Sequence, residues 1–342
     1  MVGYLARIGA RAPIVQAPMA GAGGPALAIA AMRGGAVGSL PCAMLTPAEI
    51  AAQVAAVRES AEGPLNLNFF CHHLPEPAPD EMAWRALLAP YYAAEGVEPG
   101  PPPPLRRPFD AALCEAVETA RPAIVSFHFG LPDAALLARV RGTGAQLWGN
   151  ATTVAEMRWL AAQGVDAVIA QGAEAGGHSG WFLGEAHAPT PLAVLLAETL
   201  GVPVIAAGGI ADGADIARAL AAGASAVQIG TAFLAAAESS IAAPFRALLG
   251  ADVPTGFTNL FSGREARGIV NRLMRELGPI RSEAPAFPFA SAALAPLRKA
   301  AEADGRGDYS PLWAGTGVAR ARAMAAELLV GQLVEELASA RA

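Results

Sequence analysis

A glycine-rich stretch that ends in a histidine is the first feature of this chain that suits proton transfer. The stretch Gln171-Gly172-Ala173-Glu174-Ala175-Gly176-Gly177-His178 directly follows a short apolar run. An imidazole titrates near neutral pH, so His178 can serve as a general base, and the glycines before it let the backbone approach a flat ligand. The alternative is an exposed loop histidine without a chemical role. We interpret His178 as the catalytic base.

Two other polar residues near such junctions allow weaker assignments. His128 stands in Ser126-Phe127-His128-Phe129-Gly130, where it can orient an anionic group of a substrate or pack as a core residue between the two phenylalanines. Both interpretations stay open. Glu174 is better explained as an acceptor of backbone N–H bonds that holds the glycine loop than as a catalytic acid.

Two later glycine-containing junctions predict a phosphate site. One is Ala206-Ala207-Gly208-Gly209, and the other is Gln228-Ile229-Gly230-Thr231. Glycines let backbone N–H groups approach an anion, and the N-terminus of a following helix adds a favourable dipole. The alternative is that these glycines only permit tight turns between a strand and a helix.

A competing phosphate signal lies near the start of the chain. The stretch Gly21-Ala22-Gly23-Gly24-Pro25-Ala26 formally matches a dinucleotide-binding fingerprint. The next strand ends at Gly38-Ser39-Leu40-Pro41 without an acidic residue for a ribose. We therefore interpret the stretch as a glycine-rich turn.

The elements that must position these residues follow a βα rhythm. Eight short apolar runs alternate with alanine-rich helical stretches, which is typical of parallel strands covered on both faces. Eight such units predict an α/β fold, a closed (β/α)8 TIM barrel, with its site at the carboxyl ends of the strands. The predicted strands are Ile14–Ala17, Ala36–Leu40, Leu65–Phe70, Ala123–Phe127, Ala145–Trp148, Ala167–Ala170, Pro203–Ala207 and Ala226–Ile229.

Two segments interrupt the rhythm and suggest a domain organisation. Residues 1–240 are predicted to form the barrel, with a proline-rich insertion at about 71–110 whose tract Pro99-Gly100-Pro101-Pro102-Pro103-Pro104 is expected to be extended. Residues 241–320 follow strand eight and are expected to form a lid-like insertion over the barrel mouth. Val318–Ala342 is predicted to be one amphipathic helix, whose part 321–342 packs on the barrel.

Composition excludes several classes of function. The chain has 342 residues and a net charge of −6, so no basic surplus favours nucleic acid or an anionic membrane. We find neither a membrane span nor a signal core, and expect a cytoplasmic protein. Three scattered cysteines indicate neither a disulfide framework nor a CxxC metal site. His72 and His73 are adjacent, so they cannot share a helix face at metal-ligand spacing, and His187 has no partner motif; we expect no metal.

The junctions together resemble the nitronate monooxygenase family, formerly called 2-nitropropane dioxygenases, which are FMN-dependent barrels. The resemblance spans nearly the whole chain, and its most discriminating motif runs from Ala170 to His178. The other motifs are Pro13–Met19, Ser126–Gly130, Ala206–Gly209, Phe261-Ser262-Gly263-Arg264 and Leu312-Trp313-Ala314-Gly315.

The resemblance implies a cofactor site, a reaction and its residues. It implies that FMN is bound by Met19, Asn68, Gln171, Gly176, Gly209, Gln228, Ile229, Gly230 and Thr231. It also implies that His178 is the base at the flavin, and that a nitronate or nitroalkane is oxidised with O2, as in the class I branch that acts on propionate 3-nitronate. The amides of Asn68 and Gln171 suit the polar edge of a flavin, because each can donate and accept hydrogen bonds.

The chain departs from the class I pattern after the barrel. Some members place tyrosines and a lysine over the substrate, whereas this chain has there Ala286-Phe287-Pro288-Phe289-Ala290-Ser291, a stretch with no tyrosine and with no lysine before Lys299. We expect Phe287 to stand in for a tyrosine and to line the substrate site together with His128. The preferred substrate, and not the flavin chemistry, is the property that this departure affects.

Three rival interpretations remain at this point. An FMN barrel of the same build can take electrons from NAD(P)H and pass them to a quinone or an enoyl thioester. A second rival is a flavin-binding or storage protein without catalysis, which would have no use for a histidine at the flavin ring. A third rival is a barrel that binds a nucleotide or sugar phosphate in place of flavin, and such a protein would lack the yellow colour of bound flavin. The sequence does not indicate an oligomeric state.

Overall fold

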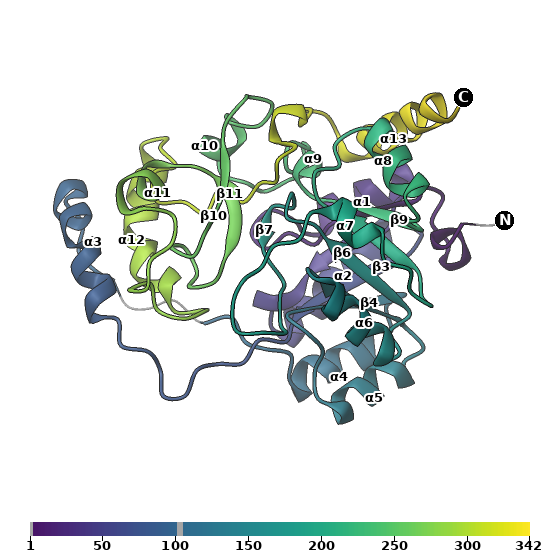
Figure 1. Ribbon diagram of the computed structural model, residues 1–342, viewed down its shortest axis with the longest axis horizontal. Helices are drawn as coiled ribbons and strands as arrows, with labels where there is room; N and C mark the ends of the chain where they lie inside the picture. Colours follow the sequence, from purple (N-terminus) through teal and green to yellow (C-terminus); the bar gives the residue numbers. More distant parts are fainter. Residues whose placement is uncertain (1–2, 101–104) are drawn as a thin grey trace.

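The main body of the molecule is a closed barrel of eight parallel strands, seen in a computed structural model that describes residues 3–100 and 105–342 (Figure 1). The strands neighbour one another in the order β1-β9-β8-β6-β5-β4-β3-β2, and a parallel bridge between Val15 and Val37 closes the ring. The predicted (β/α)8 barrel is confirmed. Its strands are β1 (Ile14–Gln16), β2 (Gly38–Pro41), β3 (Leu65–Phe70), β4 (Ile124–His128), β5 (Gln146–Ala151), β6 (Ala167–Gln171), β8 (Val204–Ala207) and β9 (Ala226–Ile229).

Successive side chains of each strand point alternately out of and into the barrel, and they form two separate apolar cores. In β3, Leu65, Leu67 and Phe69 join the large cluster between the strands and the surrounding helices. Residues of the opposite parity on other strands, such as Val15, Trp148 and Ile205, form a second buried cluster that fills the inside of the barrel. This two-sided burial explains why the strands are almost continuously apolar in sequence.

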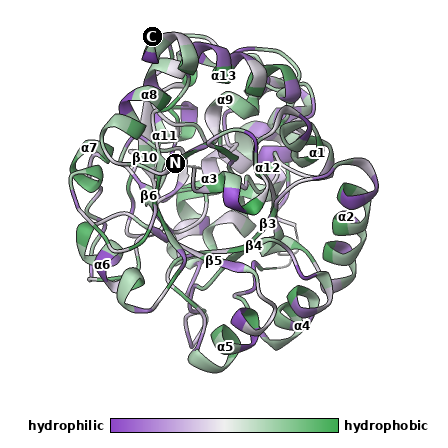
Figure 2. Ribbon diagram, turned by 90° about the vertical axis from the view of Figure 1, so that its right-hand side faces the viewer, coloured by the Kyte–Doolittle hydropathy of each residue, from purple (hydrophilic) through white to green (hydrophobic). Residues whose placement is uncertain are grey.

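A ring of helices covers the outside of the barrel (Figure 2). Asp or Thr caps begin several of them: the side chains of Thr46, Asp110, Asp133, Thr153 and Asp212 each accept a backbone N–H of the first turn. The helices are α1 (Pro25–Gly34), α2 (Pro47–Ser60), α4 (Ala111–Ala120), α5 (Ala134–Gly142), α6 (Val154–Ala162), α7 (Leu192–Leu196), α8 (Gly213–Ala221) and α9 (Thr231–Leu234). Short 3-10 turns are η1 (Leu5–Ile8), η2 (Cys42–Met44) and η3 (Val318–Arg320).

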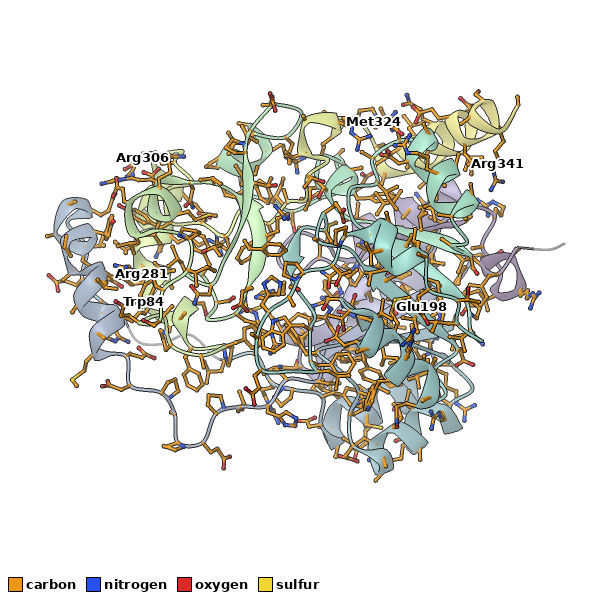
Figure 3. All side chains as sticks on the ribbon, in the orientation of Figure 1. Trp84, Glu198, Arg281, Arg306, Met324 and Arg341 are labelled. Atoms are coloured by element: carbon orange, nitrogen blue, oxygen red, sulfur yellow. The ribbon has the colours of Figure 1, made fainter. Side chains whose placement is uncertain are left out.

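Helix α3 (Met82–Glu95) of the proline-rich insertion packs far from its neighbours in sequence, and the sequence analysis missed it. It joins residues between Leu260 and Tyr309 in a separate hydrophobic cluster, and Trp84 Nε1 donates a hydrogen bond to the Ala290 carbonyl at 3.2 Å. Trp84 and Arg306 mark this second module in Figure 3. Residues 101–104 of the predicted extended tract lie outside the described residues.

The second module also contains a small antiparallel sheet that reaches back to the barrel. Strand β11 (Ala266–Ile269) pairs with β10 (Thr255–Thr258) on one side and with the two-residue strand β7 (Gly177–His178) on the other. Figure 1 shows β7 between the two parts of the molecule. The helices of this region are α10 (Ala243–Arg246), α11 (Arg272–Leu277) and α12 (Ala290–Ala303).

The chain ends in helix α13 (Ala326–Arg341), which packs against α1 and α8. The prediction of one helix over Val318–Ala342 is wrong for its first part, because η3 ends at Arg320 and both Ala321 and Ala325 have extended backbones. The arginines in this stretch bond to the loop before α8 instead of continuing a helix. Among the described helices, none is long and apolar enough to cross a membrane.

Candidate active site

A layer of polar side chains lies at the carboxyl ends of the barrel strands. Asn68 on β3 donates from Nδ2 to Ser126 Oγ on β4 at 2.9 Å, and Asn150 on β5 donates to Gln171 Oε1 on β6 at 2.9 Å. These amides are buried or half-buried, and they alternate with the outward apolar residues of the same strands. The strand register therefore brings Asn68 and Gln171, which are far apart in sequence, to the same end of the barrel.

The loop that carries His178 is held from both sides. Gln171 Nε2 donates to the His178 carbonyl at 2.8 Å, and Gln171 Oε1 accepts from Gly180 N at 3.0 Å. On the other side His178 pairs with Ala266 of β11. Glu156, fully buried, accepts backbone N–H bonds from Phe182 and Leu183 just beyond the loop. His178 therefore has a fixed backbone and is not an exposed loop histidine.

Aromatic rings surround the His178 imidazole. Ring centroids lie at 5.3 Å for Phe287, 5.5 Å for Trp313, 6.1 Å for Phe129 and 6.2 Å for Phe70. Phe129 has a φ of +69°, an unusual conformation for a residue with a side chain, and such strain is typical of functional sites. The structure thus brings the predicted residues His178 and Phe287 together in one cluster of aromatic rings, and this cluster is called the histidine pocket below.

Two further histidines share this pocket. His128 donates from Nε2 to the His178 carbonyl at 3.2 Å, and His72 donates from Nε2 to the Arg106 carbonyl at 3.1 Å. Burial lowers the pKa of His128 to about 3 and that of His72 to about 4. Burial, reinforced by the charge of Arg106, lowers the pKa of His178 well below its ordinary value. All three imidazoles are therefore neutral at pH 7, and His72 belongs to the site although its sequence did not indicate it.

Two arginines that the sequence analysis did not assign border the same pocket. The guanidinium of Arg264 lies over the ring of Phe129 at 4.3 Å and over that of Trp181 at 4.5 Å, and that of Arg106 lies 5.7 Å from the ring centroid of Phe287. Burial lowers the pKa of Arg264 to about 10, so it stays charged at neutral pH. Neither arginine forms an ion pair within residues 3–100 and 105–342. The pocket is therefore suited to an anion.

The two predicted phosphate junctions lie side by side at the same barrel end, because β8 and β9 are paired. Gly208 and Gly209 have φ of +121° and +70°, which side chains rarely adopt. The backbone N–H groups of Gly208, Gly209 and Gly230 donate to no other group in the described part of the chain. Thr231 Oγ1 accepts from Gly315 N at 2.9 Å, which leaves its own hydrogen free to donate. These donors fit a phosphate.

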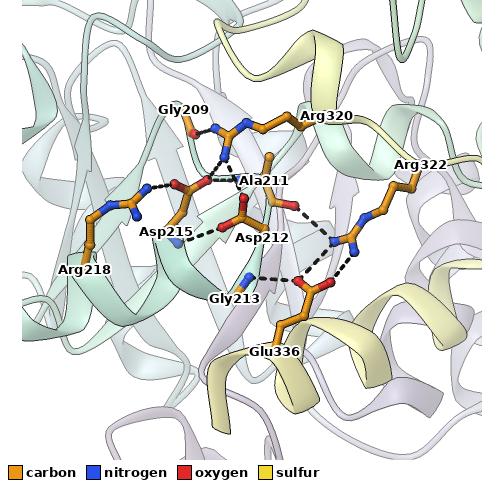
Figure 4. Close-up of polar contacts among 9 residues, drawn as sticks. All are labelled: Gly209, Ala211, Asp212, Gly213, Asp215, Arg218, Arg320, Arg322 and Glu336. Carbon is orange, nitrogen blue, oxygen red and sulfur yellow. Dashed lines mark hydrogen bonds and ion pairs between the residues drawn. The ribbon is translucent and has the colours of Figure 1, made fainter. Parts of the chain in front are cut away.

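Carboxylates of the protein lie at the start of helix α8, the helix that follows the first glycine junction. Asp215 Oδ2 accepts from Ala211 N just before the helix, and within the first turn Glu336 Oε2 accepts from Gly213 N and Asp212 Oδ1 from Asp215 N (Figure 4). Arg320 offsets this charge by pairing with Asp212 and Asp215 at 2.7 and 2.6 Å. Among the described residues, none of these carboxylates accepts from the N–H groups of Gly208, Gly209 or Gly230.

The other predicted cofactor residues lie around these junctions. Gly230 faces Met19, whose sulfur would lie 3.8 Å from a Cβ at that position. Gln228 has a buried Oε1 without a partner among the described residues, and Ile229 is buried in the outer core. Gly176 is required for packing, because a Cβ there would meet Gly315 N at 2.4 Å. Glu174 accepts a backbone N–H as predicted, although the donor is Leu192 and not the glycine loop.

A β/α barrel, a cluster of histidines and adjoining anion donors together define the class of this protein. It has the architecture of a barrel enzyme with its site at the carboxyl ends of the strands. A family model described as nitronate monooxygenase matches residues 5–339. The chain belongs to this family and is an oxidoreductase.

The relatives cover nearly the whole chain. It is 42% identical to a nitronate monooxygenase from Paraburkholderia phytofirmans, over 96% of this chain and 93% of the relative, and 41% identical to one from Pseudomonas aeruginosa, over 96% and 97%. The structure resembles nitroalkane oxidase from Streptomyces ansochromogenes with a TM-score of 0.88 and 40% identity, covering 97% of each chain. FabK from Thermotoga maritima, with a TM-score of 0.71 and 23% identity over 97% of this chain and 94% of FabK, shares the fold.

Proposed function

We propose that the protein oxidises alkyl nitronates with O2, using bound FMN, to give a carbonyl compound and nitrite. The observation that carries the proposal is the half-buried, neutral His178 imidazole, which lies among aromatic rings and is bordered by two arginines. Family membership supports a nitronate as the substrate, since relatives are named for that activity. FMN, when bound, would supply the electron transfer that no side chain of this chain can perform.

The chain offers a fitting place for FMN. The unpaired N–H groups of Gly208, Gly209 and Gly230 and the hydroxyl of Thr231 would hold its phosphate. The partnerless Gln228 Oε1 and the remaining N–H of Gln171 would bond to polar atoms of the flavin. Met19 and Gly176 lie beside these groups, and Asn68 belongs to the same polar layer.

His178 and the arginines would divide the work on the substrate. Neutral His178 has a lone pair that can take a proton from the α-carbon of a nitroalkane, whereas a nitronate has already lost that proton. Arg106 and Arg264 would attract the negative charge of a nitronate, and Arg106 would also suit the carboxylate of a propionate 3-nitronate-like substrate. Phe287 and His128 would form walls of the substrate site.

A test of the proposal uses the purified protein in the absence of oxygen. Heat release and chromatography should identify FMN, and a propionate 3-nitronate solution should bleach the flavin absorption, which O2 then restores with formation of nitrite. NADH should leave the flavin oxidised. Bleaching by NADH but not by nitronate would instead support the NAD(P)H-dependent reductase, and the absence of flavin would overturn the proposal.

A further inference from the structure

The partner of the His178 ring is a serine and not a carboxylate. The Nε2 atom of His178 lies 2.9 Å from Oγ of Ser262, which is 1% exposed. The same hydroxyl donates to the carbonyl oxygen of Arg264 at 3.1 Å. A hydroxyl has one hydrogen, and a carbonyl can only accept. If the hydrogen of Ser262 goes to Arg264, the hydrogen between His178 and Ser262 must come from the ring.

The backbone fixes this chain of hydrogen bonds. His178 and Ala266 are paired between β7 and β11, and Ser179 N donates to the Glu265 carbonyl at 2.9 Å, so the loop and the serine turn cannot slide apart. Gly263, between the serine and the arginine, has a φ of +85°, and a Cβ there would lie 2.0 Å from the Pro285 carbonyl oxygen. This tight turn directs the Arg264 carbonyl back to Ser262.

We propose that Ser262 is the positioning residue of His178: its hydroxyl, committed to the Arg264 carbonyl, keeps the imidazole in the Nε2–H form and leaves Nδ1 to take the substrate proton. This inference rests on the proposed function, in which His178 is the base. When Nδ1 gains a proton, Ser262 Oγ goes on accepting from Nε2–H and stabilises the imidazolium. The serine thus has the orienting role that a carboxylate has in other histidine bases.

The charges around His178 explain why a neutral hydroxyl suits its ring. Among the described residues, the charges that act most strongly on its ring are those of Arg106, His128, Arg264 and His72, and none of these four groups is acidic. His128 and His72 each donate Nε2–H to a carbonyl, so they too present Nδ1 as the atom without a proton. A neutral hydroxyl accepts from His178 without adding an acid that would neutralise the arginines.

Nitrogen NMR tests the assignment directly on the flavin-loaded enzyme. In protein labelled with ¹⁵N-histidine, His178 is assigned from the signals that are lost in His178→Asn. We expect a protonated Nε2 and an unprotonated Nδ1 at pH 7.5, retained in Ser262→Thr. In Ser262→Ala we expect a mixture of both tautomers. A wild-type ring protonated at Nδ1, or equal tautomer ratios in wild type and Ser262→Ala, would overturn the proposal.

Kinetics supply a second, independent test. Ser262→Ala should lower kcat/KM for a neutral nitroalkane roughly tenfold, as expected for one lost hydrogen bond of ordinary strength. The acid limb of the pH profile of kcat/KM should move to lower pH, because the protonated His178 ring loses the Ser262 hydroxyl as a hydrogen-bond acceptor. Nitronate oxidation should stay near wild type. An unmoved acid limb would overturn the role of Ser262. If no nitronate is oxidised but the tautomer depends on Ser262, the proposed function fails and the hydrogen-bond assignment stands.

Discussion

Arg320 donates a hydrogen bond from Nη2 to the carbonyl oxygen of Gly209 at 2.8 Å. Its other terminal nitrogen pairs with Asp212 and Asp215, the two carboxylates at the start of α8 (Figure 4). One side chain from the C-terminal segment therefore holds the left-handed glycine junction in place and also balances negative charge beside it.

Arg320→Ala should weaken FMN binding. The Gly209 carbonyl loses its donor and the two carboxylates lose their cation, so we expect the Kd for FMN to rise roughly tenfold, the size of one charge-assisted hydrogen bond at a partly exposed site. Arg218→Ala is a matched control, because Arg218 also pairs with Asp215 but does not contact Gly209. Fluorescence titration of the apoprotein measures both, and an equal effect in the two variants would contradict the account.

A carboxylate at Gly230 should abolish FMN binding. Gly230 has an ordinary backbone conformation, and a Cβ there would make normal contacts with Ala17 and Met19. Gly230→Asp would then place a negative charge where we propose the phosphate binds, whereas Gly230→Asn has nearly the same shape without the charge. We expect flavin to be lost from the first variant and largely retained in the second, as measured by absorption of the purified proteins. Full flavin content in Gly230→Asp would place the phosphate elsewhere.

The pocket histidines should make the protein less stable below pH 6.5. Burial lowers the folded pKa of His128 from 6.5 to about 3, so between these values the unfolded chain binds the proton and the folded chain does not. The free energy of unfolding therefore falls as the pH decreases from 6.5, by at most about 1.4 kcal/mol per pH unit for each such histidine.

His128→Asn should reduce this slope, as measured by urea unfolding between pH 6.5 and 5.5 at constant flavin loading. His73→Asn, at an exposed position, serves as the control. An unchanged slope in His128→Asn would mean that His128 takes up protons equally in the folded and unfolded chain.

Arg106 should discriminate between substrates. Arg106→Gln is expected to raise KM for a carboxylate-bearing nitronate roughly tenfold more than KM for an alkyl nitronate without a carboxylate, such as ethyl nitronate, because only the first loses a charge-assisted bond to its distal group. Steady-state oxygen consumption with the two substrates measures the ratio. Equal changes in both KM values would show that Arg106 acts on the nitronate group or on the pocket in general.

The barrel could be predicted from the sequence, because strands buried on both faces are short apolar runs with a helix after each. Leu65–Phe70 and Ala226–Ile229 were predicted with the observed bounds of β3 and β9. Helix α3 was missed because Pro90 lies within it and its packing partner α12 lies about two hundred residues away. The C-terminal helix was predicted too long, because the bonds of Arg320 and Arg322 to the α8 loop depend on tertiary structure.

The site was only partly predictable for the same reason. His178, His128 and Phe287 stand beside recognisable motifs, and the structure brings them into one pocket. Arg106 and His72 reach that pocket through chain folding, so their local sequence does not indicate a role, and Arg264 stands in a family motif that assigned it none. Ser262 lies in the stretch Phe261-Ser262-Gly263-Arg264, which suggested the family, but its contact with His178 requires the pairing of β7 with β11.

The most direct test of the account compares two substrates in His178→Asn. The variant should oxidise pre-equilibrated nitronate at a rate close to wild type, because that substrate has no α-proton to lose, and its turnover of freshly dissolved neutral nitroalkane should fall roughly 10²–10⁴-fold, the usual loss for a general base. Oxygen consumption with both substrates, at equal FMN content and with His73→Asn as control, measures the contrast. An equal fall in both rates with FMN still bound would contradict the assignment of His178 as the base.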